Sequence, residues 1–308
     1  MDVKRNILVT GSHRSGTTWV GRMIDLDPQI HYIFEPFNLT ENNTPCKKCG
    51  YFLENWFHYV LPEEHDKFYR HFSHLLHNPP FDAGAVKYKH AGLLKLITKR
   101  LRLLANRKKQ RALIKDPIAL YSSEWLSETF NLDVVIMIRH PAAFVSSLKR
   151  LNWGHPFSHF LNQDMLMTDH LSQFKDMITL YSSEKQDIID QAILLWKTAH
   201  FMISLFKKKH PNWHFIRHED ISANPIREFE MLYNKLNIPY TEKIKAVIKT
   251  YTSGDNPSGA EKGVAHAGKL DSKANIHNWK KILSPEEINK IRSQVEDISS
   301  EFYSDNDW

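Results

Sequence analysis

A short apolar run, a loop bounded by two glycines and an amphipathic pattern follow one another at the start of the chain. The apolar run covers residues 6–10, Gly11 and Gly16 bound the loop, and the helical pattern covers residues 17–26. Strand, glycine loop and helix in this order form the frame of a phosphate-binding loop. Glycine lets the backbone approach phosphate oxygens, and the free N–H groups at the helix start favour an anion. The alternative is a plain strand-to-helix turn.

The rest of the chain repeats the alternation of apolar runs and helical patterns. The further apolar runs cover residues 31–35, 112–116, 134–139 and 213–219, and the further helical patterns cover residues 123–130, 141–150 and 187–209. Continuous apolar runs that end in polar residues are typical of buried parallel strands. The alternation therefore predicts a P-loop-like α/β fold, in which helices flank a central parallel sheet in three layers.

Two stretches interrupt this alternation. Residues 42–109 predict a helical insertion between the second and third strands, and residues 253–278, rich in Gly, Ser, Asn and Lys, predict a loop. Long loops in compact domains often cover active sites, so we expect residues 253–278 to act as a lid. We expect residues 1–308 to form a single domain that carries both stretches.

The composition excludes several classes of protein. Of the 308 residues, 42% are hydrophobic and 25% are charged, which argues against disorder. The chain lacks the run of about 18 apolar residues that a membrane span needs, and the apolar run at 7–9 is too short for a signal peptide. Two cysteines exclude a disulfide framework, so we expect a cytoplasmic protein. The net charge of +6 suits an anionic cofactor, substrate or surface.

The first loop departs from the pattern of nucleoside triphosphatases. Thr17 stands where that pattern has a lysine that reaches the β- and γ-phosphates. The cation lies instead within the loop, as Arg14, where it can hold a 5′-phosphate and the bridging oxygen of a leaving group. The missing lysine disfavours a small-molecule kinase of the phosphate-loop type, which stays an alternative that magnesium-dependent ATP consumption would support.

The end of the fourth apolar run predicts a second phosphate site. An ATPase usually places a metal-binding aspartate near such a strand end. Here the run ends in Arg139, and Ser147 follows eight residues later on the next helical pattern. Arginine and a neighbouring hydroxyl suit a phosphate. Two phosphate sites without a magnesium ligand suit a nucleotide that carries phosphate at both its 5′ and 3′ positions, and we expect no metal requirement.

At these residues the chain resembles the sulfotransferases that use 3′-phosphoadenosine 5′-phosphosulfate (PAPS). Residues 14–19, Arg-Ser-Gly-Thr-Thr-Trp, resemble their 5′-phosphosulfate loop, and the step from Arg139 to Ser147 matches their 3′-phosphate motif. Residues 34–37, Phe-Glu-Pro-Phe, resemble a short motif of the carbohydrate sulfotransferase branch. The resemblance implies the P-loop-like fold of that family and PAPS as the sulfuryl donor.

For the 5′ half of the donor, the resemblance implies contacts along the first loop. Arg14 is expected at the leaving group, and Trp19 is expected beside the adenine. The 5′-phosphosulfate is expected to lie on the loop residues Ser15, Gly16, Thr17 and Thr18.

For the 3′ half, the resemblance implies contacts from three parts of the chain. Arg139 and Ser147 are expected to bind the 3′-phosphate. His218 stands where cytosolic members carry a tyrosine near the adenine. Lys273 matches a basic residue that closes over the 3′-phosphate, and Ser272 stands where those members have an arginine beside it.

Two carboxylates compete for the role of the base that takes the acceptor's proton. Glu35 ends the second strand, where ligands of open parallel sheets bind. Its motif resembles the carbohydrate branch, in which a glutamate at this place is the proposed base. Asp116 ends the third strand, near where cytosolic members hold their catalytic histidine. We prefer Glu35, and the alternative for either residue is a hydrogen-bonded carboxylate that shapes a loop.

Together these residues predict an enzyme that transfers a sulfuryl group from PAPS to an acceptor hydroxyl by in-line displacement. The motif around Glu35 favours a carbohydrate or glycoconjugate acceptor, such as a glycan or glycolipid. A small-molecule alcohol or phenol is the alternative acceptor. A non-catalytic binding module on the same scaffold is disfavoured by the two placed carboxylates.

Two further features stay open to several interpretations. Cys46 and Cys49 have metal-like spacing, but a zinc site needs four ligands and no second cysteine pair exists. Residues 87–111 hold ten basic residues and no acidic one, interleaved with leucines. This segment fits a core-packed helix with a solvated basic face, a groove for an anionic glycan, or a helix in peripheral contact with an anionic membrane. Nucleic acid is disfavoured because no recognition motif accompanies the charge.

Overall fold

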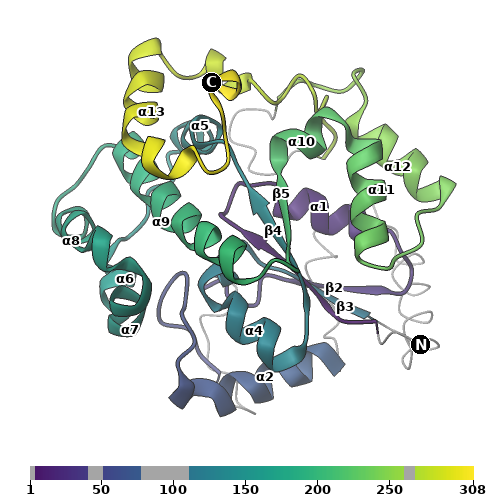
Figure 1. Cartoon of the computed structure of the whole chain (residues 1–308), viewed down its shortest axis with the longest axis horizontal. Helices are drawn as coiled ribbons and strands as arrows, with labels where there is room; N and C mark the ends of the chain where they lie inside the picture. Colours follow the sequence, from purple (N-terminus) through teal and green to yellow (C-terminus); the bar gives the residue numbers. More distant parts are fainter. Residues whose placement is uncertain (1–3, 41–50, 78–110, 260–267) are drawn as a thin grey trace. The chain divides into compact units, whose positions relative to one another are not determined.

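The computed structural model describes residues 4–40, 51–77, 111–259 and 268–308 (Figure 1). Its strands are β1 (Ile7–Gly11), β2 (Ile30–Phe34), β3 (Arg111–Lys115), β4 (Asp133–Ile138) and β5 (His214–Arg217). They form a parallel sheet in the order β2-β3-β1-β4-β5, flanked by helices. Each strand lies within two residues of an apolar run of the sequence, so the predicted α/β fold is confirmed.

The pairing of the first three strands places their ends together. β1 and β2 both pair with β3 in parallel, and Phe34 of β2 lies opposite Lys115 of β3. All residues of β1 and β3 are buried, which explains why these strands appear in the sequence as continuous runs rather than alternating ones. Because the strands are parallel, Glu35 and Asp116 follow at the same edge of the sheet as the end of β1.

Close contacts within the chain define two compact units, of which the first comprises residues 1–10 and 17–135. It contains the helices α1 (Thr17–Ile24), α2 (His65–His77) and α4 (Ser123–Phe130), with 3₁₀ turns at Pro62–Glu64 and Pro117–Ser122. Aromatic rings join α2 to α4, since Phe68 and Phe72 lie with their centroids 5.9 and 6.0 Å from the Trp125 ring. Edge-to-face contacts of this kind stabilise the pair beyond simple burial.

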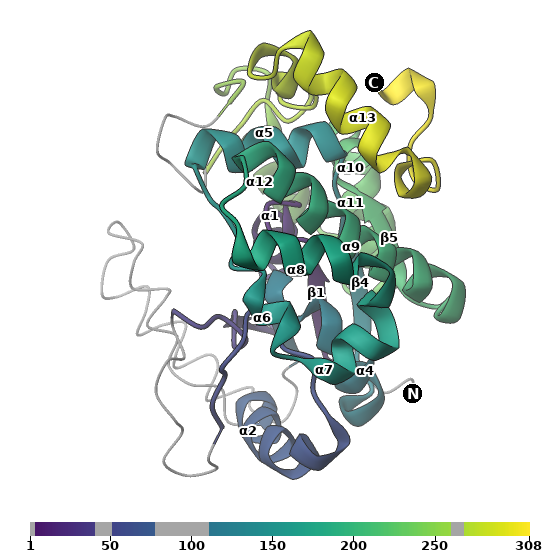
Figure 2. The same cartoon turned by 90° about the vertical axis from the view of Figure 1, so that its left-hand side faces the viewer.

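The second unit comprises residues 11–16 and 136–308. Its helices are α5 (Pro141–Leu151), α6 (Ser158–Leu161), α7 (Asp164–Leu166), α8 (Lys175–Ser183), α9 (Ile188–Lys209), α10 (His218–Ala223), α11 (Pro225–Lys235), α12 (Glu242–Thr252) and α13 (Pro285–Ser299). The long helix α9 packs against both α5 and α13 (Figures 1 and 2). Most of α9 is buried, which matches its largely apolar sequence.

Capping side chains fix where the main helices begin. Asp187 accepts a hydrogen bond from the N–H of Ile189 at 2.8 Å and starts α9. Ser284 and Glu287 form a reciprocal capping box that starts α13. Glu287 also binds Lys149 of α5 at 2.6 Å, so the same carboxylate links two helices. The predicted helical patterns are confirmed as α1, α4, α5 and α9.

The two interrupting stretches are described only in part. Within the predicted insertion, residues 51–77 are described and contain α2. The described parts of 253–278 contain turns and bends, without an α-helix or strand. The lid role of this loop and the single domain over 1–308 stay predictions.

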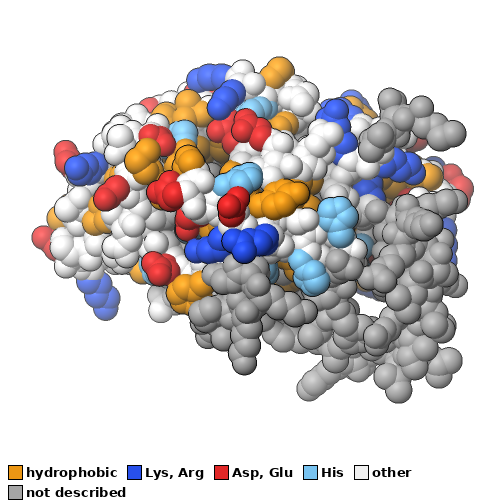
Figure 3. Space-filling view, turned by 90° about the horizontal axis from the view of Figure 1, so that it is seen from below, with side chains coloured by type: hydrophobic (Ala, Val, Ile, Leu, Met, Phe, Trp, Pro, Cys, Tyr) orange, Lys and Arg blue, Asp and Glu red, His pale blue; other side chains and the backbone are white. Residues whose placement is uncertain are grey.

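The hypotheses about the cysteines and the basic segment lie outside the described residues. Cys46, Cys49 and residues 87–110 all fall there. The range 87–110 holds nine of the chain's 41 Lys and Arg residues and leaves 32 basic against 35 acidic residues elsewhere. Acidic and basic side chains are accordingly mixed on the described surface in Figure 3. The positive excess of the sequence is therefore concentrated in that one segment.

No helix among the described residues is both long and apolar enough to cross a bilayer.

Candidate functional site

Glycines and short turns shape the phosphate loop, Gly11–Gly16, in the second unit. Gly11 has a φ of 139°, and a Cβ there would collide with the carbonyl oxygen of Met137 in β4. The N–H of Ser15 donates to the carbonyl oxygen of Ser12 at 3.2 Å and closes a turn. The Ser12 hydroxyl is buried and has no hydrogen-bond partner among the described residues. A buried hydroxyl left in this state is suited to a ligand.

The second glycine of the loop lies against a histidine of α10. Gly16 has a φ of 96°, and a Cβ there would lie 2.6 Å from Cδ2 of His218. His218 is buried, and its Nδ1 lies 3.2 Å from the hydroxyl of Ser222. Burial and the charge of Arg139 hold the pKa of His218 well below its ordinary value, so its imidazole is neutral. The resemblance had placed this histidine near the adenine, and here it packs directly on the loop.

Arg14 turns from the loop toward α5. Its Nε donates to the hydroxyl of Ser147 at 3.0 Å, and its guanidinium lies 5.7 Å from the ring centroid of Trp153. Burial and, to a smaller extent, the charges of Arg139 and Arg150 together lower the pKa of Arg14 to about 10. Three positive side chains thus act on one another here, and an anion between them would relieve their repulsion.

Arg139 follows β4 and is almost enclosed, with 12% of its side chain exposed. Its Nε lies 3.8 Å from Oε1 of Glu219, which is an ion pair but not a hydrogen bond. Burial lowers the pKa of Arg139, and the charge of Glu219 opposes that shift. The Nε–H is among the buried groups that lack a hydrogen-bond partner in the described residues.

The second unit holds the side chains that a nucleotide with two phosphates would need. The structure brings Arg14 and Ser147 into contact and places Arg139 within electrostatic reach of Arg14. The Ser12 hydroxyl is free to bind, and a Cβ at Gly16 would collide with the ring of His218 that packs on the loop. The donor set of guanidinium, hydroxyl and backbone N–H groups is the one that phosphate prefers. The residues therefore fit PAPS.

The remaining loop residues open α1 in the first unit. Thr17 is buried, whereas Thr18 and Trp19 are half-buried. Further along α1, a Cβ on Gly21 would lie 3.0 Å from Cγ of Lys115, so glycine allows the helix to pack closely on β3. The N-terminal end of α1 directly continues the phosphate loop in the sequence, as a phosphate loop requires.

Glu35 stands at the end of β2 with both carboxylate oxygens engaged by side chains. Its φ of 41° lies in the left-handed region, which is uncommon for a residue other than glycine. Oε2 accepts a hydrogen bond from Nδ2 of Asn38 at 2.7 Å, and Oε1 pairs with Nζ of Lys115. Lys115 is fully buried, and its ammonium lies 4.0 Å from the ring centroid of Phe34. Burial lowers the pKa of Lys115, which Glu35 partly opposes.

Asp116 is engaged differently, because its partners are backbone groups. Oδ2 accepts the N–H of Phe37 at 2.6 Å, and Oδ1 accepts the N–H of Ile118 at 2.8 Å. These bonds cap the 3₁₀ turn after β3 and hold the chain that follows Glu35. Burial and, to a smaller extent, the negative charge of Glu35 together raise the pKa of Asp116 to about 7. These bonds support the loop around it, and its part in catalysis stays a prediction.

Lys115 is a residue of this site that motif reasoning missed. The motifs that identify Glu35 and Asp116 do not include it, although it directly precedes Asp116. A signal was available, since a lysine inside a continuous buried strand is rare and needs a paired charge.

Lys273, predicted to close over the 3′-phosphate, is exposed in the structure. Within the described residues its ammonium forms no ion pair with a carboxylate. Its neighbour Ser272 is buried and donates to the carbonyl oxygen of Ser222 at 2.8 Å. This bond anchors the segment to α10, the helix that begins at His218.

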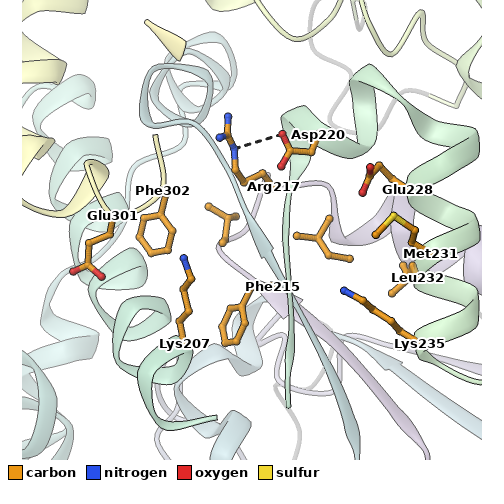
Figure 4. A pocket seen from close by; sticks show the side chains of 12 residues that line it. Lys207, Phe215, Arg217, Asp220, Glu228, Met231, Leu232, Lys235, Glu301 and Phe302 are labelled. Atoms are coloured by element: carbon orange, nitrogen blue, oxygen red, sulfur yellow. Dashed lines mark ion pairs between the residues drawn. The ribbon is translucent and has the colours of Figure 1, made fainter. Parts of the chain in front are cut away.

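A cavity of about 230 Å³ lies elsewhere in the second unit, beside β5 (Figure 4). Side chains from β5, α9 and α11 line it, among them Phe215, Lys207 and Leu232. None of the predicted site residues lines this cavity. Arg217, which does, pairs with Asp220 at 3.7 Å and also contacts residues near the end of the described chain.

Among the residues that the structure describes, no group of three or more His, Cys, Asp and Glu side chains could hold a metal ion. The expectation that no metal is required stays a prediction.

Comparison with known proteins gives the family. The profile described as the sulfotransferase family matches residues 6–242. No curated protein sequence matches the chain. Similar solved structures include the sulfotransferase domain from the curacin biosynthetic pathway (17% identity, 96% of this chain and 99% of that chain, TM-score 0.49), sulfotransferase STF9 from Mycobacterium avium (14%, 98% and 78%, 0.44), and mouse sulfotransferase SULT7A1 complexed with PAP (12%, 99% and 87%, 0.44). Because the matched profile spans most of the chain, the protein belongs to the sulfotransferase family.

Proposed function

We propose that this sulfotransferase transfers the sulfuryl group of PAPS to a hydroxyl of a carbohydrate or glycoconjugate, with Glu35 as the base. The observation that carries the proposal is the meeting of Arg14 with Ser147, with Arg139 close enough to lower the pKa of Arg14. Two arginines and a hydroxyl at this spacing suit an adenosine that is phosphorylated at both ends.

The donor would be held by its two phosphate groups. Arg139 and Ser147 would bind the 3′-phosphate, while Arg14 and the loop N–H groups would bind the 5′-phosphosulfate. His218 would lie on the loop at Gly16, where the neutral ring suits an adenine better than a phosphate. PAPS, when bound, supplies a sulfuryl group attached to a good leaving group. Arg14 would stabilise the charge that develops on the departing phosphate.

The acceptor hydroxyl would lose its proton to Glu35 as its oxygen attacks sulfur. The new oxygen–sulfur bond would form as the bond from sulfur to the 5′-phosphate oxygen breaks, and adenosine 3′,5′-bisphosphate would leave. Lys115 would hold the Glu35 carboxylate in place through Oε1. A positioned base of this kind contributes about 10²–10⁴-fold to the rate.

Asp116 is the weaker candidate for the base because of its partners. Both of its oxygens accept backbone N–H groups, so a loss of its negative charge would weaken bonds that shape the loop. Glu35 is bound by the side chains of Asn38 and Lys115, and weakening these bonds leaves the backbone bonds of that loop in place. The geometry therefore supports the preference for Glu35.

An aromatic ring beside Glu35 supports an acceptor with an apolar face. Phe34 is 37% exposed although it is a large hydrophobic residue at a strand end. An exposed ring at this place suits the face of a sugar ring, and it also suits a phenol. The motif at 34–37 favours the carbohydrate, and the small alcohol or phenol is the second candidate.

The test is an acceptor screen with isotopically labelled PAPS, read by mass spectrometry for a gain of one sulfuryl group. The panel should contain oligosaccharides, glycolipids, aliphatic alcohols and phenols. We expect labelled oligosaccharide or glycolipid. Labelling of phenols or simple alcohols alone would select the second candidate, and magnesium-dependent ATP consumption without sulfuryl transfer would revive the kinase alternative.

A further inference from the structure

A buried glutamate joins the end of β4 to the last described segment of the second unit. Glu219, at the start of α10, is 8% exposed. Its Oε1 accepts the backbone N–H of His140 at 3.2 Å and lies 3.8 Å from Nε of Arg139. Its Oε2 accepts the phenolic O–H of Tyr303 at 2.9 Å. The Glu219 carboxylate therefore contacts Arg139, which is predicted to bind the 3′-phosphate, the backbone of His140, and Tyr303, which lies 84 residues away in the sequence.

Tyr303 is itself held in a fixed position. The guanidinium of Arg217 lies 4.5 Å from its ring centroid, and Arg217 pairs with Asp307 in the same segment. Burial and the charge of Glu219 raise the pKa of Tyr303 well above its ordinary value. The phenol thus keeps its proton and stays a hydrogen-bond donor to Glu219.

The ring of His140 packs the same segment onto the strand end. Its centroid lies 4.9 Å from that of Tyr303 and 4.5 Å from that of Trp308, and it stacks on Trp279 at 5.1 Å. Burial lowers the pKa of His140 to about 3, so the ring is neutral. Neither ring nitrogen has a hydrogen-bond partner among the described residues, so the histidine contributes packing and its backbone N–H.

These contacts decide how Arg139 presents its guanidinium. Glu219 faces the Nε edge, and within the described residues no acceptor is hydrogen-bonded to the Nη atoms. A guanidinium binds phosphate best through two parallel N–H groups of one edge. An arginine that is already oriented loses less rotamer freedom on binding, so its affinity for the ligand is higher.

We propose that Glu219 and Tyr303 are positioning residues for Arg139, which fix its guanidinium so that the Nη edge receives the 3′-phosphate of the donor. Tyr303 orients the Glu219 carboxylate, and Glu219 orients Arg139. The inference rests on the proposed function, because it takes a 3′-phosphorylated adenosine as the ligand.

The test compares two nucleotides that differ only in the 3′-phosphate. Calorimetry gives the Kd of adenosine 3′,5′-bisphosphate and of adenosine 5′-monophosphate at fixed ionic strength. The Kd of the monophosphate divided by the Kd of the bisphosphate measures the contribution of the 3′-phosphate to binding. In Tyr303→Phe we expect this ratio to fall about tenfold, because one hydrogen bond to a charged group is lost. Binding of the monophosphate should not change.

A matched control exists in the same unit. Tyr240 donates its O–H to the carbonyl oxygen of Ile226 at 3.1 Å and makes no hydrogen bond with Glu219 or Arg139 among the described residues. Tyr240→Phe removes the same chemical group and should leave the ratio of the two Kd values unchanged. Glu219→Gln keeps the side-chain shape and removes its charge, and we expect it to lower the ratio as Tyr303→Phe does.

Each other outcome contradicts a specific step. If Tyr303→Phe leaves the ratio unchanged, or weakens binding of both nucleotides equally, the tyrosine has only a structural role. A higher ratio in Glu219→Gln would make Glu219 a competitor of the phosphate and overturn the positioning role. A wild-type protein that does not prefer the bisphosphate would overturn the proposed donor site itself, and this result appears before any variant is measured.

Discussion

Replacing Glu35 by glutamine removes the proposed base and changes little else in shape. Glutamine keeps an oxygen that can accept from Asn38, whose Nδ2 lies 2.7 Å from the Glu35 carboxylate. It can no longer take a proton from the acceptor. Because a positioned general base contributes about 10²–10⁴-fold, turnover of Glu35→Gln should fall by at least about 100-fold.

The same substitution should cost stability through Lys115. This lysine is fully buried and pairs with Glu35, and Asp116 is its other negative neighbour. Breaking a buried ion pair by removing one partner costs about 3–5 kcal/mol. Here Asp116 stays charged more easily once the charge of Glu35 is gone, so we expect a loss at the low end of this range, about 3 kcal/mol. A domain of ordinary stability stays folded after such a loss.

The assay separates chemistry from binding and folding. Turnover is measured with labelled PAPS and the acceptor found in the screen, while calorimetry gives the Kd of adenosine 3′,5′-bisphosphate. Glu35→Gln should keep that Kd within about threefold, since Arg14, Ser147 and Arg139 are unchanged. Urea unfolding gives the change in free energy of unfolding.

Asp116→Asn is the matched control. It removes the charge of the rival carboxylate, whose two oxygens accept the N–H groups of Phe37 and Ile118. Asparagine can keep one of these bonds, so we expect a loss of about 1–3 kcal/mol in stability and a turnover within about tenfold of wild type. Near-normal turnover in Glu35→Gln together with a 100-fold loss in Asp116→Asn would refute the assignment and move the base to Asp116.

The remaining predictions concern the loop and the buried histidines. Arg14→Ala and Arg139→Ala should each weaken binding of adenosine 3′,5′-bisphosphate by about 10–100-fold, as calorimetry would show, because each removes hydrogen bonds to a charged ligand; unchanged binding in both would contradict the two-phosphate site. Gly16→Ala should lower the free energy of unfolding by more than about 1 kcal/mol, because φ is 96° and His218 lies in the way, whereas Gly268→Ala, with open space around it, should change it little. Burial lowers the pKa of three histidines from 6.5 to about 3 in the folded protein: His13, His140 and His200. Between pH 6.5 and 3 these groups bind protons only after unfolding. The free energy of unfolding is therefore highest above pH 6.5 and decreases as the pH falls toward 3, by about 1.4 kcal/mol per histidine and pH unit. Urea unfolding at pH 7.5 and 5.5 tests this, and equal stability at both would show that the rings are protonated in the folded state.

The strands and the family were predictable from the sequence because they depend on local patterns. β1 and β3 are buried along their whole length, so each appears as a continuous apolar run that ends where the chain reaches the sheet edge. The start of α9 lies at Asp187, a capping residue next to an apolar pattern. The match of the sulfotransferase profile confirms the predicted class of enzyme.

The partners of the site residues were not predictable in the same way. Lys115 meets Glu35 across 80 residues of sequence, and Tyr303 meets Glu219 across 84. Such contacts follow from strand register and from how a terminal segment packs, and neither leaves a short motif. The parallel pairing of Phe34 with Lys115 brings this lysine next to Glu35.

The choice between the two carboxylates shows why partners matter more than position. Glu35 and Asp116 both follow paired parallel strands and both lie at the same sheet edge, so topology treats them alike. Backbone N–H groups cannot leave Asp116 without moving the turn they belong to, and each would be left buried without a partner. Two partners of Glu35, Asn38 and Lys115, are side chains, so weakening their bonds to the carboxylate leaves the turn after β3 in place. This difference in partners is the reason why we expect Glu35, rather than Asp116, to exchange a proton during turnover.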